Sequence, residues 1–393
     1  MRTRDALCVL GAMALAIALG GCTGETYRAP DQVTSPSWSP DANKLAFVAS
    51  RGGTGARVYS TDLTGERPAP RVLLLAWLIN GPMAWSPDGS QLAVAGSDVG
   101  DDALVGHLWV APVERERELQ ELAEGPLFWF PEWSPDGARL AYTESRTAYE
   151  CALLVSTLDG HTEKVVEGPG TWLFLQWSPD GKLISYKKAI GHTQAAALGV
   201  QTGLYVCSVR NGSERCVVPG GAVWCLWLGP DELLVQCSRL EPGSPLTKPG
   251  VWSLNLATGA RSLLLARDKL PRELKGGSPV PRWHRGTHQL LYSGTDEKLV
   301  AKPQAEPAPT AETPPSLPQG ASTQPDYTYH IYRADLSAGH VRQLTSGPNS
   351  DTEPCWSPDG SRIAFVRNKT ELWMMASDGS NQQKLLSVGE LPL

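Results

Sequence analysis

The sequence predicts an all-β fold, a β-propeller of four-stranded blades, in which seven blades fit the repeats best and six to eight are compatible. The first observation is a motif beginning Trp-Ser-Pro-Asp that occurs five times, headed by Trp38, Trp85, Trp133, Trp177 and Trp356. The second is a pair of degenerate copies, headed by Trp227 and Trp283. The third is the spacing: successive heads lie 47, 48, 44, 50, 56 and 73 residues apart, enough for four short strands with their loops. Because one such sheet cannot bury both of its faces, radial stacking of the copies is favoured.

Each repeat predicts the same series of elements. A first strand ends at the tryptophan, and Pro-Asp-Gly then makes a tight turn, because proline presets φ, aspartate accepts a backbone hydrogen bond and glycine adopts positive φ. A second strand follows, as in Arg362–Val366, and a third comes after a variable gap, as in Leu372–Met374. Pairs such as Asp-Gly and Asn-Gly mark a hairpin to the fourth strand, for example Lys164–Val166. The recurring aspartates are therefore expected to be structural, with an acid/base set as the alternative.

The N-terminus predicts a processed leader over 1–21, a lipidated tether over 22–32 and a single propeller domain over 33–393. Arg2 and Arg4 precede an apolar run, 6–19, that is too short to cross a bilayer as a helix. The run ends in Leu-Gly-Gly-Cys, which resembles the bacterial lipobox, so Cys22 is the expected lipidation site; an ordinary secretory leader is the alternative. We expect an extracytoplasmic, membrane-anchored lipoprotein, on the periplasmic side or the cell surface.

Charge and motifs exclude several classes of function. The chain has a net charge of -6, and removing Arg2, Arg4 and Asp5 with the leader makes it about -7. An acidic chain without a stretch rich in lysine and arginine is not expected to bind nucleic acid. The common hydrolase, metalloprotease, phosphate-binding and Cys-x-x-Cys motifs do not occur. We therefore expect no catalytic residue, no cofactor and no metal site; His284 and His288 replace a turn between strands, where helical ligand spacing has no meaning.

The repeats resemble the Pro-Asp repeats of the TolB-type propellers, which also occur in the noncatalytic domain of prolyl oligopeptidase relatives. The resemblance covers nearly the whole mature chain, from about residue 33 to about residue 388, and five near-identical heads make it specific. The chain departs from TolB, a soluble periplasmic protein with a six-bladed propeller and a preceding α/β domain, so partner contacts of that missing domain do not carry over.

Six cysteines remain after the leader and the lipidated residue are set aside, which suits an oxidising compartment. If Asn211-Gly212 is a two-residue hairpin turn, Cys207 faces Cys216 at a non-hydrogen-bonded position, where side chains are closest. The pair is a possible disulfide. Free buried thiols are the alternative.

The connections predict where a ligand binds. In a propeller blade, the first-to-second and third-to-fourth turns lie on one face, here named the turn face. The second-to-third and fourth-to-first connections lie on the opposite face, here named the insertion face, and they include all three large insertions, 189–203, 239–250 and 294–328. Elaboration of one face is typical of a binding surface, with loop drift as the alternative. Within the last insertion, 301–325 is rich in proline and is predicted to be disordered.

Candidate contact residues lie along this face. Trp129 and Trp172 are either exposed stacking platforms or core wedges between blades, and Arg51, Arg146 and Arg239 each follow a second strand toward the same rim. We expect a monomeric, noncatalytic scaffold that binds an envelope protein or glycan. The alternative is an envelope enzyme, a polysaccharide lyase or glycosidase, with its site on the insertion face.

Overall fold

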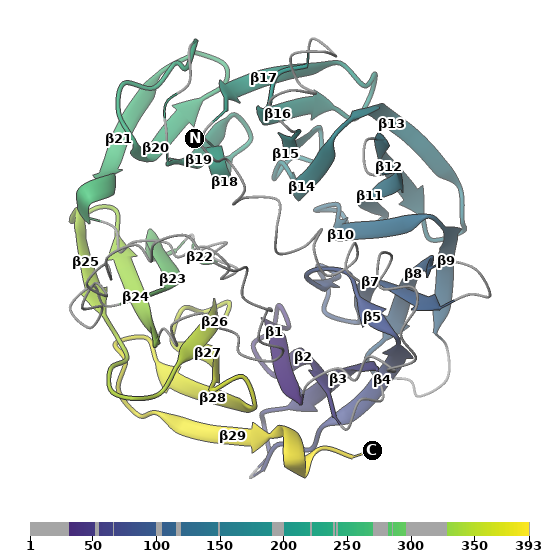
Figure 1. The fold of residues 1–393 in the computed structure, drawn as a ribbon, viewed down its shortest axis with the longest axis vertical. Coiled ribbons are helices and arrows are strands. Elements are labelled where there is room, and N and C mark those ends of the chain that lie inside the picture. The colour runs from purple at the N-terminus through teal and green to yellow at the C-terminus, as the bar shows by residue number, and fades with distance from the viewer. Residues whose placement is uncertain are drawn as a thin grey trace, which may run out of the picture.

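The chain forms a ring of seven antiparallel sheets around a common centre (Figure 1). The computed structural model describes residues 31–392 except 52–54, 66, 100–103, 115–118, 148–149, 191–199, 221, 239, 241–242, 270–281, 285 and 296–327. Each sheet is one sequence repeat, and its strands run in chain order from the centre outward. The predicted seven-bladed all-β propeller is confirmed. The leader, Cys22 and the proline-rich segment 301–325 lie outside the described residues.

The strands of the blades are as follows. Blade 1 contains β1 (Gln32–Trp38), β2 (Lys44–Ser50), β3 (Ala56–Asp62) and β4 (Arg71–Ala76), and blade 2 contains β5 (Leu78–Ile79), β6 (Ala84–Trp85), β7 (Gln91–Val99), β8 (Leu104–Pro112) and β9 (Gln120–Gly125). Blade 3 contains β10 (Leu127–Trp133), β11 (Arg139–Thr147), β12 (Glu150–Thr157) and β13 (Thr162–Pro169), and blade 4 contains β14 (Thr171–Trp177), β15 (Leu183–Ala189), β16 (Gly203–Ser208) and β17 (Glu214–Pro219). Blade 5 contains β18 (Ala222–Gly229), β19 (Glu232–Cys237), β20 (Gly250–Asn255) and β21 (Arg261–Ala266), followed by the short helix η1 (Arg267–Lys269). Blade 6 contains β22 (Arg282–His284), β23 (Gln289–Thr295), β24 (Tyr329–Asp335) and β25 (His340–Gln343), and blade 7 contains β26 (Asp351–Trp356), β27 (Arg362–Arg367), β28 (Glu371–Ala376), β29 (Gln383–Ser387) and the short helix η3 (Val388–Glu390).

The Trp-Ser-Pro-Asp turns are closed by their own side chains. In blade 3 the Ser134 hydroxyl donates to the Asp136 carboxylate, and Ser134 Oγ accepts the backbone N–H of Arg139 at 2.9 Å. The hydroxyl bond lowers the pKa of Asp136, and the equivalent bond from Ser357 lowers the pKa of Asp359 to about 2. These aspartates are therefore occupied in holding the first strand of a blade to the second.

The head tryptophans link neighbouring blades. Each indole Nε1 donates, over 3.0–3.3 Å, to the carbonyl of the residue just before the head tryptophan of the preceding blade: Trp38 to Cys355, Trp85 to Ser37, Trp133 to Ala84, Trp177 to Glu132 and Trp227 to Gln176. The indole nitrogens of Trp283 and Trp356 are buried without a hydrogen-bond partner. The series is thus interrupted on both sides of blade 6, where His284 stands in place of the usual Ser-Pro-Asp turn.

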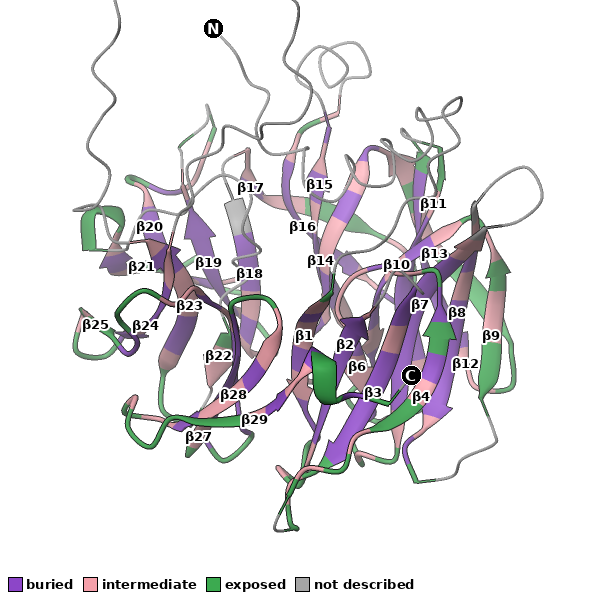
Figure 2. Ribbon diagram, turned by 60° about the horizontal axis from the view of Figure 1, so that its bottom comes forward, coloured by how far each residue is buried: buried purple, intermediate pink, exposed green. Residues whose placement is uncertain are grey.

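The hydrophobic core is divided among the blade interfaces. Seven clusters of buried side chains occur in the described part of the chain, and each lies between two adjacent blades. The second and third strands are buried along most of their length, whereas the outer strands β9 and β25 expose much of theirs (Figure 2). The two smallest clusters flank blade 6. Within the described residues, blade 6 therefore lacks the indole hydrogen bond on both of its sides and borders the two smallest core clusters.

Among the described strands, none is exchanged between the first and the last blade of the ring. Blade 1 begins with the first described strand and blade 7 ends with the last, so their contact is made by side chains and loops. The Arg362 guanidinium stacks 4.7 Å above the Trp38 ring and donates to the Ala42 carbonyl at 2.8 Å. The C-terminal segment reaches blade 1, where Arg51 donates to the Leu391 carbonyl at 2.8 Å. Burial of apolar side chains between blades 7 and 1 completes the closure.

Candidate functional site

The predicted arginines differ in their surroundings. Arg51 is engaged with the C-terminal segment, as described above, and Arg239 lies outside the described residues. Arg146 is exposed at the end of β11, and its Nε lies 3.2 Å from the carboxylate of Glu144, which is buried. Of the three, Arg146 lies on the insertion face with a guanidinium that solvent reaches.

The two predicted aromatic platforms have different environments. Trp172 is 1% exposed and belongs to the core between blades 3 and 4, so its assignment as an exposed platform is wrong and the core-wedge alternative holds. Trp129 is partly buried and packs against the same core, with its ring 6.5 Å from that of Phe130. Both tryptophans follow a Gly-Pro connection, on β10 and β14, and pack against the interface between blades 3 and 4. The large apolar area that they bury stabilises this interface.

Trp172 forms one wall of a buried box around a lysine. The Lys188 ammonium lies 4.7 Å from the centre of the Trp172 ring and 4.5 Å from that of Tyr205. It also forms an ion pair of 2.6 Å with Glu214, which accepts a hydrogen bond from Tyr186. The box is therefore filled by a side chain of the protein itself.

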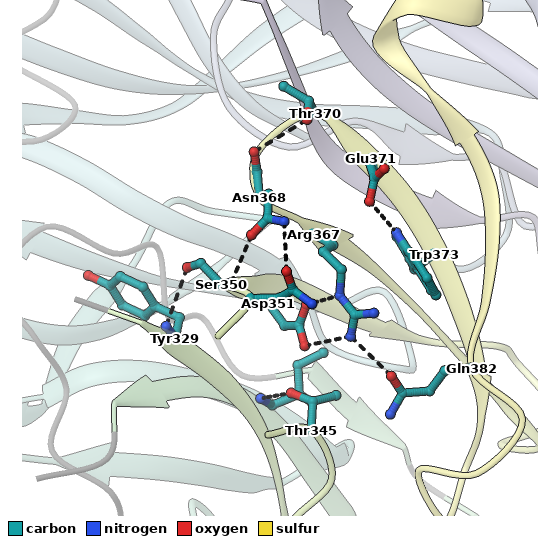
Figure 3. A network of polar contacts seen from close by, with 12 residues as sticks. Tyr329, Thr345, Ser350, Asp351, Arg367, Asn368, Thr370, Glu371, Trp373 and Gln382 are labelled. Carbon is teal, nitrogen blue, oxygen red and sulfur yellow. Dashed lines mark hydrogen bonds and ion pairs between the residues drawn. The ribbon is translucent and has the colours of Figure 1, made fainter. Parts of the chain in front are cut away.

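Blade 7 carries an equivalent buried charge. Arg367 and Lys188 stand at the same distance after the head tryptophan of their blades, near the end of the second strand. Arg367 binds Asp351 through Nε at 2.7 Å and Nη2 at 2.9 Å, and Gln382 accepts a further bond at 3.0 Å (Figure 3). The guanidinium also lies 4.2 Å from the centre of the Trp373 ring. Both charges are satisfied internally and join strands within a blade.

The predicted pairing of Cys207 with Cys216 rested on a register that the structure contradicts. Cys207 lies opposite Glu214, and Cys216 lies opposite Tyr205. The hairpin contains an irregularity between Leu204 and Tyr205, and its turn is longer than the assumed two residues. Both thiols are free.

Two glutamates lie on innermost strands, Glu132 on β10 and Glu353 on β26. Burial raises the pKa of Glu132 to about 7 and raises the pKa of Glu353 in the same direction. The charge of Arg282, on the innermost strand β22, opposes both shifts. The inner wall of the ring therefore combines two unusually basic carboxylates with one arginine within their electrostatic reach.

A second polar group lies at the outer rim of blade 2, and we call it the blade-2 rim cluster: Trp77, Asp98, His107, Glu121 and Glu124. His107, Glu121 and Glu124 each offer one potential ligand atom, and these three atoms lie within 4.8 Å of one another. His107 Nδ1 is 2.5 Å from Glu121 Oε1, and its Nε2 is 3.8 Å from Asp98 Oδ2. Asp98 also accepts the backbone N–H of Trp77 at 2.8 Å. Sequence reasoning missed this cluster because its members come from three strands and a connection, and only strand register brings them together.

The insertion face also exposes large apolar side chains. Trp77, in the connection from blade 1 to blade 2, is 37% exposed, and Leu240, in the second-to-third connection of blade 5, is 36% exposed. Trp77 therefore places an exposed aromatic ring beside the blade-2 rim cluster, where Asp98 accepts its backbone N–H. Exposed aromatic residues with polar neighbours are typical of recognition surfaces.

Comparisons with known proteins agree with this architecture. Residues 23–202 match the family model described as TolB beta propeller domain (PD40). A stretch of 132 residues, 34% of this chain, is 29% identical to the uncharacterized peptidase YuxL of Bacillus subtilis (strain 168), and it spans 18% of that protein.

Two solved structures show the same fold. The β-propeller domain of the Trilobed protease from Pyrococcus furiosus, described as having an open velcro topology, superposes with a TM-score of 0.59 and 11% identity, covering 93% of this chain and 98% of that one. Pyrococcus horikoshii acylaminoacyl peptidase superposes with a TM-score of 0.60 and 13% identity, covering 93% of this chain and 53% of that one, so the chain spans about half its length. The repeats, the sheets and the family model that matches residues 23–202 show a seven-bladed propeller that is similar to the TolB-type β-propellers.

Proposed function

We propose that the chain is a noncatalytic binding module of the bacterial cell envelope. Lipid at Cys22 holds it on the extracytoplasmic side of a membrane, and as a monomer it presents the insertion face to an envelope protein or glycan. This assignment joins the lipobox-like leader to the TolB-type propeller, a fold built for recognition by its loops.

The observation that carries the proposal is the contrast between the two faces. On the turn face, the intact repeat heads form the same turn, with serine and aspartate bonded to each other. On the insertion face, Trp77 exposes an aromatic ring and Arg146 exposes a guanidinium, beside the aliphatic side chain of Leu240. The exposed apolar side chains toward the turn face, Val72 and Leu119, are aliphatic only. A partner gains more from desolvating exposed aromatic and arginine side chains than from turns whose polar groups are already satisfied.

The described residues contain no helix long and apolar enough to cross a membrane. Anchoring is assigned to acyl chains on Cys22 because the leader ends in a lipobox-like motif, and two or more chains bind a bilayer stably. The Cys22→Ser variant should leave the membrane fraction and stay folded, because the propeller has its own core. Retention of that variant on membranes after a high-salt wash would overturn the anchor.

Capture of partners tests the binding role. The tagged lipoprotein, solubilised from native envelope after cross-linking, should recover a defined protein or glycan fragment. Trp77→Ser should reduce that recovery by tenfold or more, as expected for an aromatic anchor. A matched control is Val72→Ser, which alters an exposed apolar residue at the turn-face end of β4. Equal recovery by both variants would contradict recognition through Trp77.

A further inference from the structure

His107, Glu121 and Glu124 of the blade-2 rim cluster offer a set of metal ligands. Their nearest ligand atoms lie within 4.8 Å of one another, although they come from the two neighbouring strands β8 and β9. The register explains this, because Glu124 lies opposite His107 and Glu121 lies opposite Trp109, two residues further along β8. One imidazole and two carboxylates are ligands that Zn²⁺ accepts in proteins.

The imidazole is held in place before any ion arrives. The His107 ring stacks on the Trp109 ring with centroids 4.9 Å apart and planes within 9°. Gly96, opposite His107, leaves room for this stack, since a Cβ at that position would lie 2.6 Å from the Trp109 ring. Trp109 itself is buried in the core between blades 1 and 2. The histidine therefore has little freedom, whereas the exposed glutamates can adjust.

Asp98 lies on the side of the imidazole away from Glu121. Its Oδ1 is bonded to the backbone N–H of Trp77, and its Oδ2 faces His107 Nε2 at 3.8 Å. A carboxylate that accepts the second ring N–H of a histidine is the usual support of a metal ligand. Asp98 would take that role if the 3.8 Å separation shortened to a hydrogen bond when an ion binds. The other ring nitrogen is Nδ1, which lies 2.5 Å from Glu121.

The charges around the imidazole are unbalanced. Three carboxylates, Asp98, Glu121 and Glu124, surround one histidine, and no lysine or arginine in the described part of the chain forms an ion pair with them. In the metal-free chain, a proton lies between Nδ1 and the Glu121 carboxylate, which are 2.5 Å apart. Loss of that proton leaves two acceptors that face the same point. A cation between them satisfies both acceptors.

We propose that His107 Nδ1, Glu121 and Glu124 bind one divalent cation, for which Zn²⁺ is the best match, with Asp98 as the positioning residue. Tetrahedral ligation at 2.0–2.1 Å places ligand atoms roughly 3.4 Å apart. This lies between the 2.5 Å of the His107–Glu121 contact and the 4.8 Å that bounds the set, so small side-chain shifts suffice. Three protein ligands leave a fourth position open to water or to an oxygen of a bound partner. The site faces the rim beside Trp77, and it stands independently of the proposed binding function because it is tested with the metal alone.

The test is calorimetric titration of Zn²⁺ into the mature chain, freed of its affinity tag and treated with a chelator. We expect one ion per chain, and Glu121→Gln and Glu124→Gln should each weaken binding at least tenfold. The matched control, Glu163→Gln, changes an exposed carboxylate on the outer strand of blade 3 and should bind as wild type does. Asp98→Asn should weaken binding 10- to 100-fold.

A second measurement separates a lost ligand from a damaged fold. Zn²⁺ should raise the melting temperature of the wild type and of Glu163→Gln, whereas the ligand variants should melt as the metal-free wild type does, with or without the ion. Binding that is unchanged in both ligand variants would place the ion elsewhere and overturn the proposal. So would the absence of binding at millimolar Zn²⁺ in a wild-type chain that is folded.

Discussion

Replacing Asp351 with asparagine tests how the blades hold buried charge. Asp351 is fully buried, Arg367 is 8% exposed, and two charge-assisted hydrogen bonds of 2.7 and 2.9 Å join them. Removing one partner of such a pair costs about 3–5 kcal/mol, because the remaining charge stays buried without compensation. Since Gln382 and the Trp373 ring continue to contact the guanidinium, we expect a loss near the lower end, about 3 kcal/mol.

The assay is urea unfolding followed by tryptophan fluorescence, with the free energy of unfolding as the measured quantity. The control is Glu167→Gln, which removes a surface ion pair whose side chains are 43% and 60% exposed, and it should cost less than about 1 kcal/mol. The double variant Asp351→Leu with Arg367→Met should recover much of the loss, because apolar side chains can replace a buried pair at little cost. A loss for Asp351→Asn no larger than that of the control would refute this account of the buried pair.

Three further predictions concern single groups. Trp177→Phe should lower the free energy of unfolding by about 1 kcal/mol, because the Trp177 indole donates a hydrogen bond to the preceding blade. Trp356→Phe should lower it less, since the buried Trp356 indole nitrogen has no partner. Urea unfolding of both variants tests this difference, and equal losses would contradict it. Burial raises the pKa of Glu132 from 4.5 to about 7, so the folded chain keeps a proton that the unfolded chain has lost. The free energy of unfolding of the wild type should therefore fall as the pH rises from 4.5 to 7. Glu132→Gln should not show this fall and should be the more stable protein above pH 7. Identical pH profiles of the variant and the wild type would argue against a buried, protonated Glu132. Peptide mapping without reduction should find Cys207 and Cys216 unlinked, with Cys216, the more exposed, alkylated first; a recovered linked peptide would reverse this.

The blade pattern follows from the sequence because its signals are local. The Trp-Ser-Pro-Asp heads fix where a first strand ends, and the turn chemistry lies within five residues, as the bonds from Ser134 to Asp136 and Arg139 show. The degenerate heads at Trp227 and Trp283 still start blades, because the flanking apolar strands carry the remaining signal. The five intact and two degenerate heads favoured seven repeats, with six to eight left compatible.

The candidate site depends on information that the repeat does not carry. An irregularity between Leu204 and Tyr205 moves the register of one hairpin and separates Cys207 from Cys216. Trp172 lies five residues before its head tryptophan and is buried, whereas Trp129 lies four residues before its own and is partly buried. The Gly-Pro connections that precede both did not show this difference. His107 and Glu124 lie on different strands, and only their pairing shows that they meet.

The most direct test of the central claim compares the two faces of the ring in one capture experiment. One variant carries Trp77→Ser and Leu240→Ser on the insertion face, and the other carries Glu114→Lys and Lys182→Glu, whose side chains are 71% and 79% exposed on the turn face. Both are recovered from solubilised envelope with whatever partner the wild type captures. We predict that the insertion-face variant loses the partner and the turn-face variant retains it. Loss of the partner by the turn-face variant alone would contradict the account.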